Sequence, residues 1–392
     1  MSDAFIVAAL RTAGGKRKGR LSGWHPVDLS AAVIDALVAR SGVDPAAVDD
    51  VIWGCVGQAG EQSSNVARNA VLASGLPESV PATSIDRQCG SSQQALHFAA
   101  QAVMSGTMDV VIAGGVESMT RVPMFTPGTL AEQAGLGTYM SQGLRARYGD
   151  VPFSQFAGAE ALARKHGLSR DDLDAFALLS HQRAIAATQA GLFREEVVAL
   201  PVRFQDGSMP GELHSVDEGI RFDVTLDAIQ TVKLLQPGGV ISAANASQIC
   251  DGASGLLVVN ERGLRTLGVA PLARIHQLHV RGGDPVIMLE APLAATEQAL
   301  CRAGLRIEDI DLYEVNEAFA SVPLAWLKAL GADPARLNVN GGAIALGHPL
   351  GGSGTKLTAT LVHALGQRGA RYGLQTMCEG GGMANVTVVE RL

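Results

Sequence analysis

The sequence predicts an α/β protein made of two similar halves, with a separate segment inserted into the first half. Three observations predict this class. Strand-like and helix-like patterns alternate over residues 5–115, which favours a sheet with helical crossovers. The order of these patterns recurs at an offset of about 262 residues. Between about residue 120 and about residue 240, the pattern changes to Gly- and Pro-containing loops over 123–137 and long helical patterns over 156–167 and 170–191.

The elements of the first half alternate regularly. Residues 5–9 read as a strand, and apolar residues at helical spacing predict a helix over 27–40. The elements that follow are a strand over 51–56, a helix over 64–73, a short strand over 83–85, a helix over 91–104 and a strand over 109–113.

Matching segments define the repeat. The small-residue turn at 90–92 falls on the turn at 352–354, and a helical pattern follows each of them. Residues 252–262 resemble residues 381–391, since both end in Glu-Arg after an apolar strand. We expect the two helices that start from equivalent turns to meet near the centre of the molecule. The predicted division is a first half of residues 1–120 with 240–268, an inserted loop domain of residues 121–239, and a second half of residues 269–392.

Composition excludes several classes of function. The formal charge is -7, from 38 acidic and 31 basic side chains, which argues against a nucleic-acid partner. The five cysteines are widely spaced and form no CxxC pair, so we assign no metal and no disulfide, and we expect a cytoplasmic protein. The apolar run at residues 4–10 reads as a first strand rather than a signal peptide. No apolar run approaches the roughly 20 residues of a membrane helix, so no membrane association is expected.

Cys89 is the first candidate for chemistry. It lies in the segment Asp-Arg-Gln-Cys-Gly-Ser-Ser at residues 86–92, between a predicted strand and a predicted helix. A thiol at a helix N-terminus is close to the positive end of the helix dipole, so we expect it to gain thiolate character. The alternative is a buried cysteine that packs as a small apolar side chain. We expect packing roles of this kind for Cys55, Cys250 and Cys301.

His348 lies in a glycine-rich segment, between Gly347 and Pro349. This segment lacks the Lys-Ser/Thr ending of a P-loop and the spacing of a dinucleotide fingerprint. A histidine on such a stiff turn suits proton transfer, and a loop histidine bonded to backbone is the alternative.

Two further segments follow predicted strands. Cys378 precedes a glycine run at residues 380–382 whose backbone N–H groups could stabilise an oxyanion, although glycines needed only for a turn would look the same. Asn316 and Glu317 follow the predicted strand at residues 310–315. This polar pair could point into a site, or Asn316 could cap the next helix.

The four segments in this order resemble the thiolase family over essentially the whole chain. They are the Cys89 turn, Asn-Glu-Ala-Phe at residues 316–319, Gly-His-Pro at 347–349 and Cys-Glu-Gly at 378–380. The resemblance implies the thiolase fold, in which two βαβαβαββ halves form a five-layered α-β-α-β-α body. It also implies cleavage of a 3-oxoacyl-CoA by coenzyme A, with coenzyme A as a substrate and with no cofactor.

The resemblance also implies roles for single residues. Cys89 would carry the acyl group, and His348 would take its proton and help to hold the oxygen of the thioester enolate. Asn316 would position a water at that oxygen, and Cys378 would move the proton at the substrate C2. The N–H groups of Cys89 and Gly380 would form a second oxyanion hole. Ser247 resembles a serine near the pantetheine of coenzyme A, and Arg221 resembles a residue near its nucleotide. Family members form homodimers and homotetramers, so we expect one of these states.

Departures from the family pattern bear on the acyl group. Asp86 stands where an asparagine is usual, and Ser92 and Ala384 stand where glycines are usual. The Cys89 and Cys378 segments are similar to those of bacterial thiolases of steroid side-chain breakdown, which implies a long or bulky acyl group.

Two other functions fit parts of the pattern. A ketoacyl synthase has a related fold, but it has a second histidine where this chain has Cys378. A non-catalytic acyl-CoA-binding protein on the same scaffold would not need all four segments.

Overall fold

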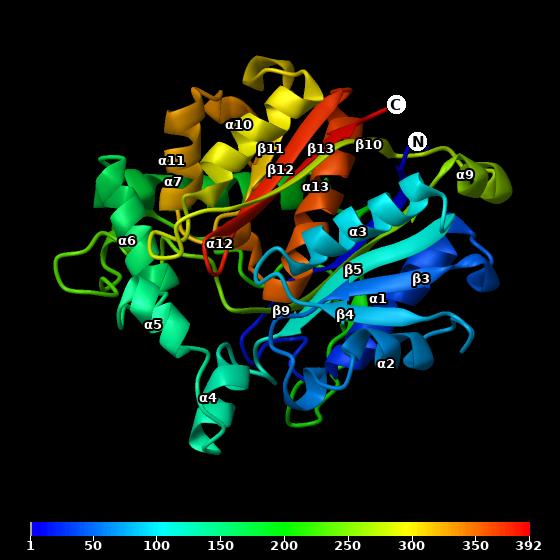
Figure 1. Ribbon diagram of the computed structural model, residues 1–392, viewed down its shortest axis with the longest axis horizontal. Helices are drawn as coiled ribbons and strands as arrows, with labels where there is room; N and C mark the ends of the chain where they lie inside the picture. The colour runs from blue at the N-terminus through cyan, green and yellow to red at the C-terminus, as the bar shows by residue number, and fades with distance from the viewer. Residues whose placement is uncertain (1) are drawn as a thin grey trace.

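The computed structural model describes residues 2–392 (Figure 1). Its main strands form one hydrogen-bonded path in the order β11-β12-β13-β10-β1-β9-β5-β3-β4. The strands of the first half are β1 (Phe5–Thr12), β3 (Asp50–Gly54), β4 (Ala82–Ile85), β5 (Val110–Ser118) and β9 (Cys250–Val259). Those of the second half are β10 (Ala273–Gly282), β11 (Leu312–Val315), β12 (Tyr372–Glu379) and β13 (Met383–Glu390).

The strand order itself repeats. β3 pairs with β5 in parallel, and β5, β9 and β1 then pair antiparallel. In the same way β11 pairs with β12 in parallel, and β12, β13 and β10 then pair antiparallel. A short antiparallel contact between β1 and β10 joins the two sets. The predicted α/β class with two similar halves is confirmed, whereas the domain boundaries stay a prediction.

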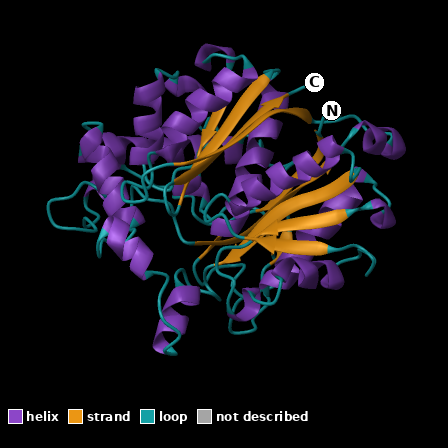
Figure 2. Ribbon diagram, in the orientation of Figure 1, coloured by secondary structure: helices purple, strands orange, loops and turns teal. Residues whose placement is uncertain are grey.

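Helices separate and cover the two sets of strands (Figure 2). Between them lie α3 (Ser91–Ser105) and α13 (Ser353–Arg368), whose apolar side chains share one core with strands of both halves. A second core packs α1 (Pro26–Ser41) and α2 (Val66–Ala73) on the outer face of the first set. A third core packs α10 (Ala291–Ala303) and α11 (Ser321–Leu330) on the outer face of the second. These layers form the expected α-β-α-β-α body.

Most of the remaining helices lie between β5 and β9. They are α4 (Thr126–Gln133), α5 (Gln142–Tyr148), α6 (Gln155–Lys165), α7 (Arg170–Gln189) and α8 (Leu226–Gln230). The helical patterns predicted here correspond to α6 and α7. The prediction of loops over residues 123–137 is wrong where α4 forms, because Pro127 lies in the first turn of that helix, where a missing N–H is tolerated.

Short elements complete the chain. β2 (Gly15–Lys16) pairs with β9, β6 (Val197–Val198) pairs with β1, and β7 (Leu200–Pro201) pairs with β8 (Leu213–His214). The two α-helices not yet described are α9 (Glu261–Leu267) and α12 (Ala343–Leu346). Over residues 2–392, no helix is both long enough and apolar enough to span a membrane.

Candidate active site

A strained turn between β4 and α3 carries Cys89. Gln88 adopts φ 49°, a left-handed conformation that costs a non-glycine residue about 1–3 kcal/mol. The hydroxyl of Ser91 holds this turn, since it donates to Gln88 O at 2.6 Å and accepts from Arg87 N at 2.9 Å. The small residues that follow Cys89 therefore fix the turn as well as permitting it.

The turn at Cys89 packs directly against the end of β12. A Cβ on Gly90 would collide with the carboxyl of Glu379, so only glycine allows this approach. A Cβ on Gly380 would lie 2.8 Å from Gln88 Oε1. Cys378 is buried at the same place, and after burial the neighbouring Cys89 is the next largest cause that raises the pKa of its thiol. Two cysteines almost 300 positions apart in the chain thus meet at one site.

The helix that follows His348 meets the helix that follows Cys89. Thr355 N, in the first turn of α13, donates to Ser92 Oγ at 3.0 Å, and a Cβ on Gly354 would collide with the backbone of Gln93. The expected meeting of the two helix starts is confirmed. Leu350, two residues after His348, lines the same cavity as Cys89 and Gly380.

Hydrogen bonds fix the tautomer of His348. Ser353 Oγ donates to Pro349 O at 2.8 Å, so it accepts from His348 Nδ1. The other ring nitrogen, Nε2, lies 3.3 Å from Asn316 Nδ2, which can only donate. His348 Nε2 is therefore an unprotonated acceptor. Burial lowers the pKa of His348 to about 3, with a further contribution from Lys356, so the ring is neutral at pH 7.

Asn316 is not a helix cap. The next helix, α11, begins at Ser321 with Ala320 before it, so that alternative is wrong. Asn316 is buried, and its Oδ1 has no hydrogen-bond partner among the described residues. A buried amide oxygen without a partner is suited to a bound water or a substrate group. Glu317 points elsewhere and accepts from Ser180 Oγ, Asn338 Nδ2 and Ile344 N.

Both cysteines are protonated at rest. Burial, followed by the charge of Glu379, raises the pKa of Cys89 to about 12. The expectation that the helix dipole would give this thiol thiolate character is wrong for the resting site, because burial and a neighbouring carboxyl outweigh the dipole. A base must therefore remove the proton before the sulfur reacts, and a neutral imidazole is a suitable acceptor.

The sequence did not single out Glu117, and it assigned no role to Glu379 within the Cys-Glu-Gly segment. Glu117 is buried and accepts from Val56 N, Gly57 N, Gln62 Nε2 and Gly351 N, so it ties the first half to the loop after His348. Glu379 is also buried, and neither of its carboxyl oxygens has a hydrogen-bond partner among residues 2–392. Burial raises the pKa of Glu379 to about 8, while Arg87 opposes the shift.

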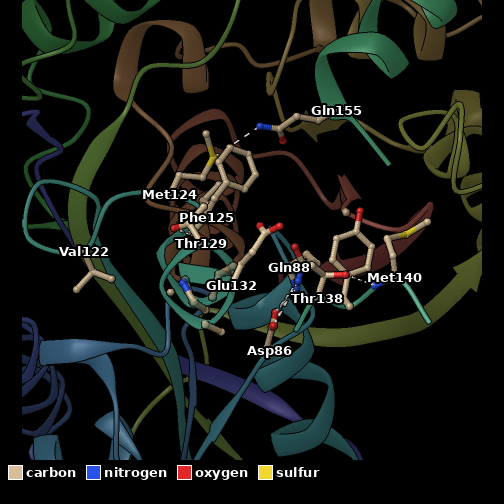
Figure 3. A pocket seen from close by; sticks show the side chains of 18 of the residues that line it. Asp86, Gln88, Val122, Met124, Phe125, Thr129, Glu132, Thr138, Met140 and Gln155 are labelled. Atoms are coloured by element: carbon tan, nitrogen blue, oxygen red, sulfur yellow. Dashed lines mark hydrogen bonds between the residues drawn. The ribbon is translucent and has the colours of Figure 1, made fainter. Parts of the chain in front are cut away.

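A cavity of about 840 Å³ opens beside Cys89 (Figure 3). Such a volume is large enough for a drug-sized ligand. Cys89 and Gly380 lie in its wall, together with Asp86, Gln88 and Glu117. Much of the remaining wall comes from residues 119–140, and its apolar side chains are Met119, Val122, Met124, Phe125, Pro127, Ala131, Leu136, Tyr139 and Met140.

A second cavity, of about 370 Å³, contains Arg221 together with His181, Gln248 and Ile344. His181, which the sequence did not single out, accepts from Arg221 N at 3.3 Å, and burial lowers its pKa to about 4. Ser247 does not line this cavity, although its neighbour Gln248 does. The backbone N–H of Ser247 donates to Ala318 O at 3.0 Å, within the segment that carries Asn316.

The other three cysteines have no place in the wall of the large cavity, although Cys250 packs against Gly347, the residue before His348. Cys55 and Cys250 are buried as expected, whereas Cys301 is exposed on α10, so its assignment to the core is wrong. Within the described residues, no group of three His, Cys, Asp or Glu side chains is arranged to hold a metal ion.

Comparisons with known proteins agree over the whole chain. Residues 4–262 match the family model described as Thiolase, N-terminal domain, and residues 269–391 match Thiolase, C-terminal domain. A steroid 3-ketoacyl-CoA thiolase of Mycobacterium tuberculosis is 51% identical over 394 residues, which cover 100% of this chain and 95% of that protein. A 3-ketoacyl-CoA thiolase of Pseudoalteromonas translucida is 43% identical and one of Citrobacter koseri is 42% identical, each over 407 residues and the full length of both chains.

Proposed function

Since the chain belongs to the thiolase family, we propose that it cleaves 3-oxoacyl-CoA with coenzyme A, giving acetyl-CoA and a shortened acyl-CoA. The chain is thus an acyltransferase of fatty acid degradation, and coenzyme A is its substrate. The observation that carries the proposal is the meeting of Cys89 and Cys378 beside one large cavity, with a neutral histidine on the adjoining loop.

The first half-reaction forms an acyl-enzyme. His348 Nε2 takes the proton of Cys89, and the thiolate attacks C3 of the substrate. The C2–C3 bond breaks, and its electron pair passes to the enolate of acetyl-CoA. The protonated His348 and a water held by Asn316 stabilise the enolate oxygen, and N–H groups of Cys89 and Gly380 stabilise the oxygen on C3. Preformed donors of this kind contribute roughly 3–4 kcal/mol each. Cys378 gives its proton to C2, and the proton on His348 then restores the Cys378 thiol.

The second half-reaction releases the product. Coenzyme A gives its thiol proton to His348 and attacks the acyl group on Cys89. The Cys89 thiolate leaves and takes the proton from His348, so the site returns to its resting state. Arg221 is proposed to contact the nucleotide of coenzyme A from the second cavity, and Ser247 to lie near its pantetheine.

The size and apolar wall of the cavity support a long or bulky acyl group, such as a steroid side chain. We expect kcat/KM for thiolysis to rise at least about tenfold from acetoacetyl-CoA to long-chain or steroid 3-oxoacyl-CoA, because each buried methylene contributes about 0.8 kcal/mol. Rates on acetoacetyl, medium-chain, long-chain and steroid substrates check this. A preference for acetoacetyl-CoA would contradict the acyl assignment and leave the reaction type intact.

The state of Glu379 predicts an alkaline limit on the reaction. As pH rises through about 8, this carboxyl ionises, and its charge opposes formation of a thiolate at either cysteine. We expect kcat/KM to fall above about pH 8 in the native enzyme but not in Glu379→Gln, whose amide does not ionise.

Stability follows the same ionisation. The folded pKa of Glu379 is raised, so its stabilising effect is complete below its ordinary pKa of 4.5 and is lost as pH rises through about 8. Thermal unfolding of the native enzyme and of Glu379→Gln, measured against pH, tests this prediction. The pH–rate profiles of the same two proteins test the alkaline limit on activity. An alkaline limb of equal size in the variant would show that another group titrates.

Location and assembly are also proposed. The chain is proposed to act in the cytoplasm as a homodimer or homotetramer, without membrane or nucleic-acid partners. The family relationship supports the assembly, and light scattering with size-exclusion chromatography measures it. A ketoacyl synthase is the other candidate, and turnover of CoA thioesters in the absence of any acyl carrier protein separates it from a thiolase.

A further inference from the structure

Lys356 is a buried cation on α13 that contacts the loop carrying His348. Its Nζ lies 2.5 Å from Leu346 O and 3.3 Å from Gly347 O, the two carbonyls immediately before His348. It also forms an ion pair with Asp217 Oδ1 at 3.5 Å. A lysine is almost never this buried unless its charge is paired, so the contacts with the two carbonyls and Asp217 are what allow its burial.

Lys356 is part of a buried network of ion pairs. Asp217 also pairs with Arg11 Nη1 at 2.9 Å and accepts from Gly14 N at 2.8 Å. Arg11 Nε pairs with Glu196 Oε1 at 2.6 Å, and Thr360 on α13 donates to the same oxygen. Two cations and two anions thus fix α13, β1 and the inserted segment against one another.

Lys356 is also next to the groups that hold the imidazole. A small cavity of about 10 Å³ is lined by Lys356 together with Ser353 and Asn316, the two residues bonded to His348. Besides the two reacting thiols, the ionisable groups packed around this loop are Lys356, Asp217, Glu314 on β11, Glu117 on β5 and Cys250 on β9.

We propose that Lys356 is a positioning residue for the same reaction, fixing the loop of residues 346–348 so that His348 Nε2 faces the site. The inference rests on the proposed role of His348 as the base. The ammonium group has a second effect, because after burial its positive charge is the next cause that lowers the pKa of His348. One side chain therefore holds the loop of the imidazole and adds to the effect of burial that keeps the ring neutral.

Lys356→Met tests this, since methionine fills much of the space without charge or donors. We expect kcat for thiolysis to fall about 100-fold with KM changed less than about threefold, as for a displaced reacting group. The acid limb of kcat/KM should move to higher pH, since the imidazole now protonates more readily.

Thr358→Val is the matched control. Thr358 is buried on the same helix and donates to Gly354 O and Gln375 Oε1, so its loss also removes buried hydrogen bonds. We expect it to lower the unfolding temperature without moving the acid limb. A Lys356→Met enzyme with kcat within about threefold of this control, and with the same acid limb, would overturn the inference.

Lys356→Arg keeps the positive charge. This variant provides a second test in case Lys356→Met does not fold. It should retain the acid limb of the native enzyme and lose less kcat than Lys356→Met. A shifted acid limb in this variant would contradict the role of the charge. The ring signals of His348, assigned with His348→Asn and titrated by NMR in labelled protein, test the charge without turnover. An unmoved midpoint in the methionine variant would refute the inference even where thiolysis is confirmed.

Discussion

Replacing Cys89 by alanine is expected to abolish thiolysis, with kcat reduced on the order of 10⁴-fold or more. The variant loses the only sulfur that the proposed mechanism uses to carry the acyl group, and no second nucleophile faces C3 in that scheme. The structure should survive, because the side-chain hydrogen bonds that hold the turn come from Ser91, and the Cys89 thiol makes none with the residues that the structure describes. Initial rates with a long-chain 3-oxoacyl-CoA measure the effect.

Two controls separate chemistry from folding in that experiment. Cys301→Ala removes an exposed thiol on α10, away from the cavity, and should leave kcat within about twofold of the native value. Unfolding temperatures of both variants should match that of the native enzyme. A Cys89→Ala protein that turns over at more than a few per cent of the native rate would exclude this thiol as the nucleophile.

Replacing Cys378 by alanine is expected to lower kcat for thiolysis by about 10²- to 10⁴-fold, the usual effect of losing a general acid. The loss should be confined to cleavage of the C2–C3 bond, because only that step needs a proton at C2. Transfer of an acyl group between Cys89 and coenzyme A uses His348 alone.

An exchange assay distinguishes the two cysteines. Labelled coenzyme A exchanging into a saturated acyl-CoA should proceed in Cys378→Ala within about tenfold of the native rate, and it should vanish in Cys89→Ala. If both variants lost exchange equally, the separate roles assigned to the two thiols would be wrong.

Local patterns predicted much of the fold. Helical spacing located α1, α2 and α3 to within two residues at each end, because their apolar faces are regular. The repeat located the meeting of α3 and α13, since equivalent turns occupy equivalent places in two similar halves. The helix α4 was not predicted, because Pro127 and Gly128 are typical of loops when the contacts around them are unknown.

The site was predicted in outline for a different reason. Cys89, His348, Asn316 and Cys378 stand in short distinctive segments, so their order was enough to identify them. Glu117 and Lys356 carry no such mark, because Glu117 contacts Gly351 and Lys356 pairs with Asp217, which are both distant in the chain. Glu379 stands in the segment of Cys378, but its burial without a hydrogen-bond partner among the described residues is not visible there. The protonation state of the thiols was also not predicted. The position of Cys89 before a helix was visible in the sequence, whereas its burial and its contact with the carboxyl of Glu379 were not.

The central claim is that Cys89 forms a covalent bond to the acyl group. Native enzyme mixed with a 3-oxoacyl-CoA in the absence of free coenzyme A, then quenched in acid and mapped by mass spectrometry, tests it most directly. The account predicts the mass of the shortened acyl group on the peptide that contains Cys89, and its disappearance when coenzyme A is added before the quench. Acyl mass on the peptide of Cys378 instead, or on no cysteine while acetyl-CoA is still released, would contradict it.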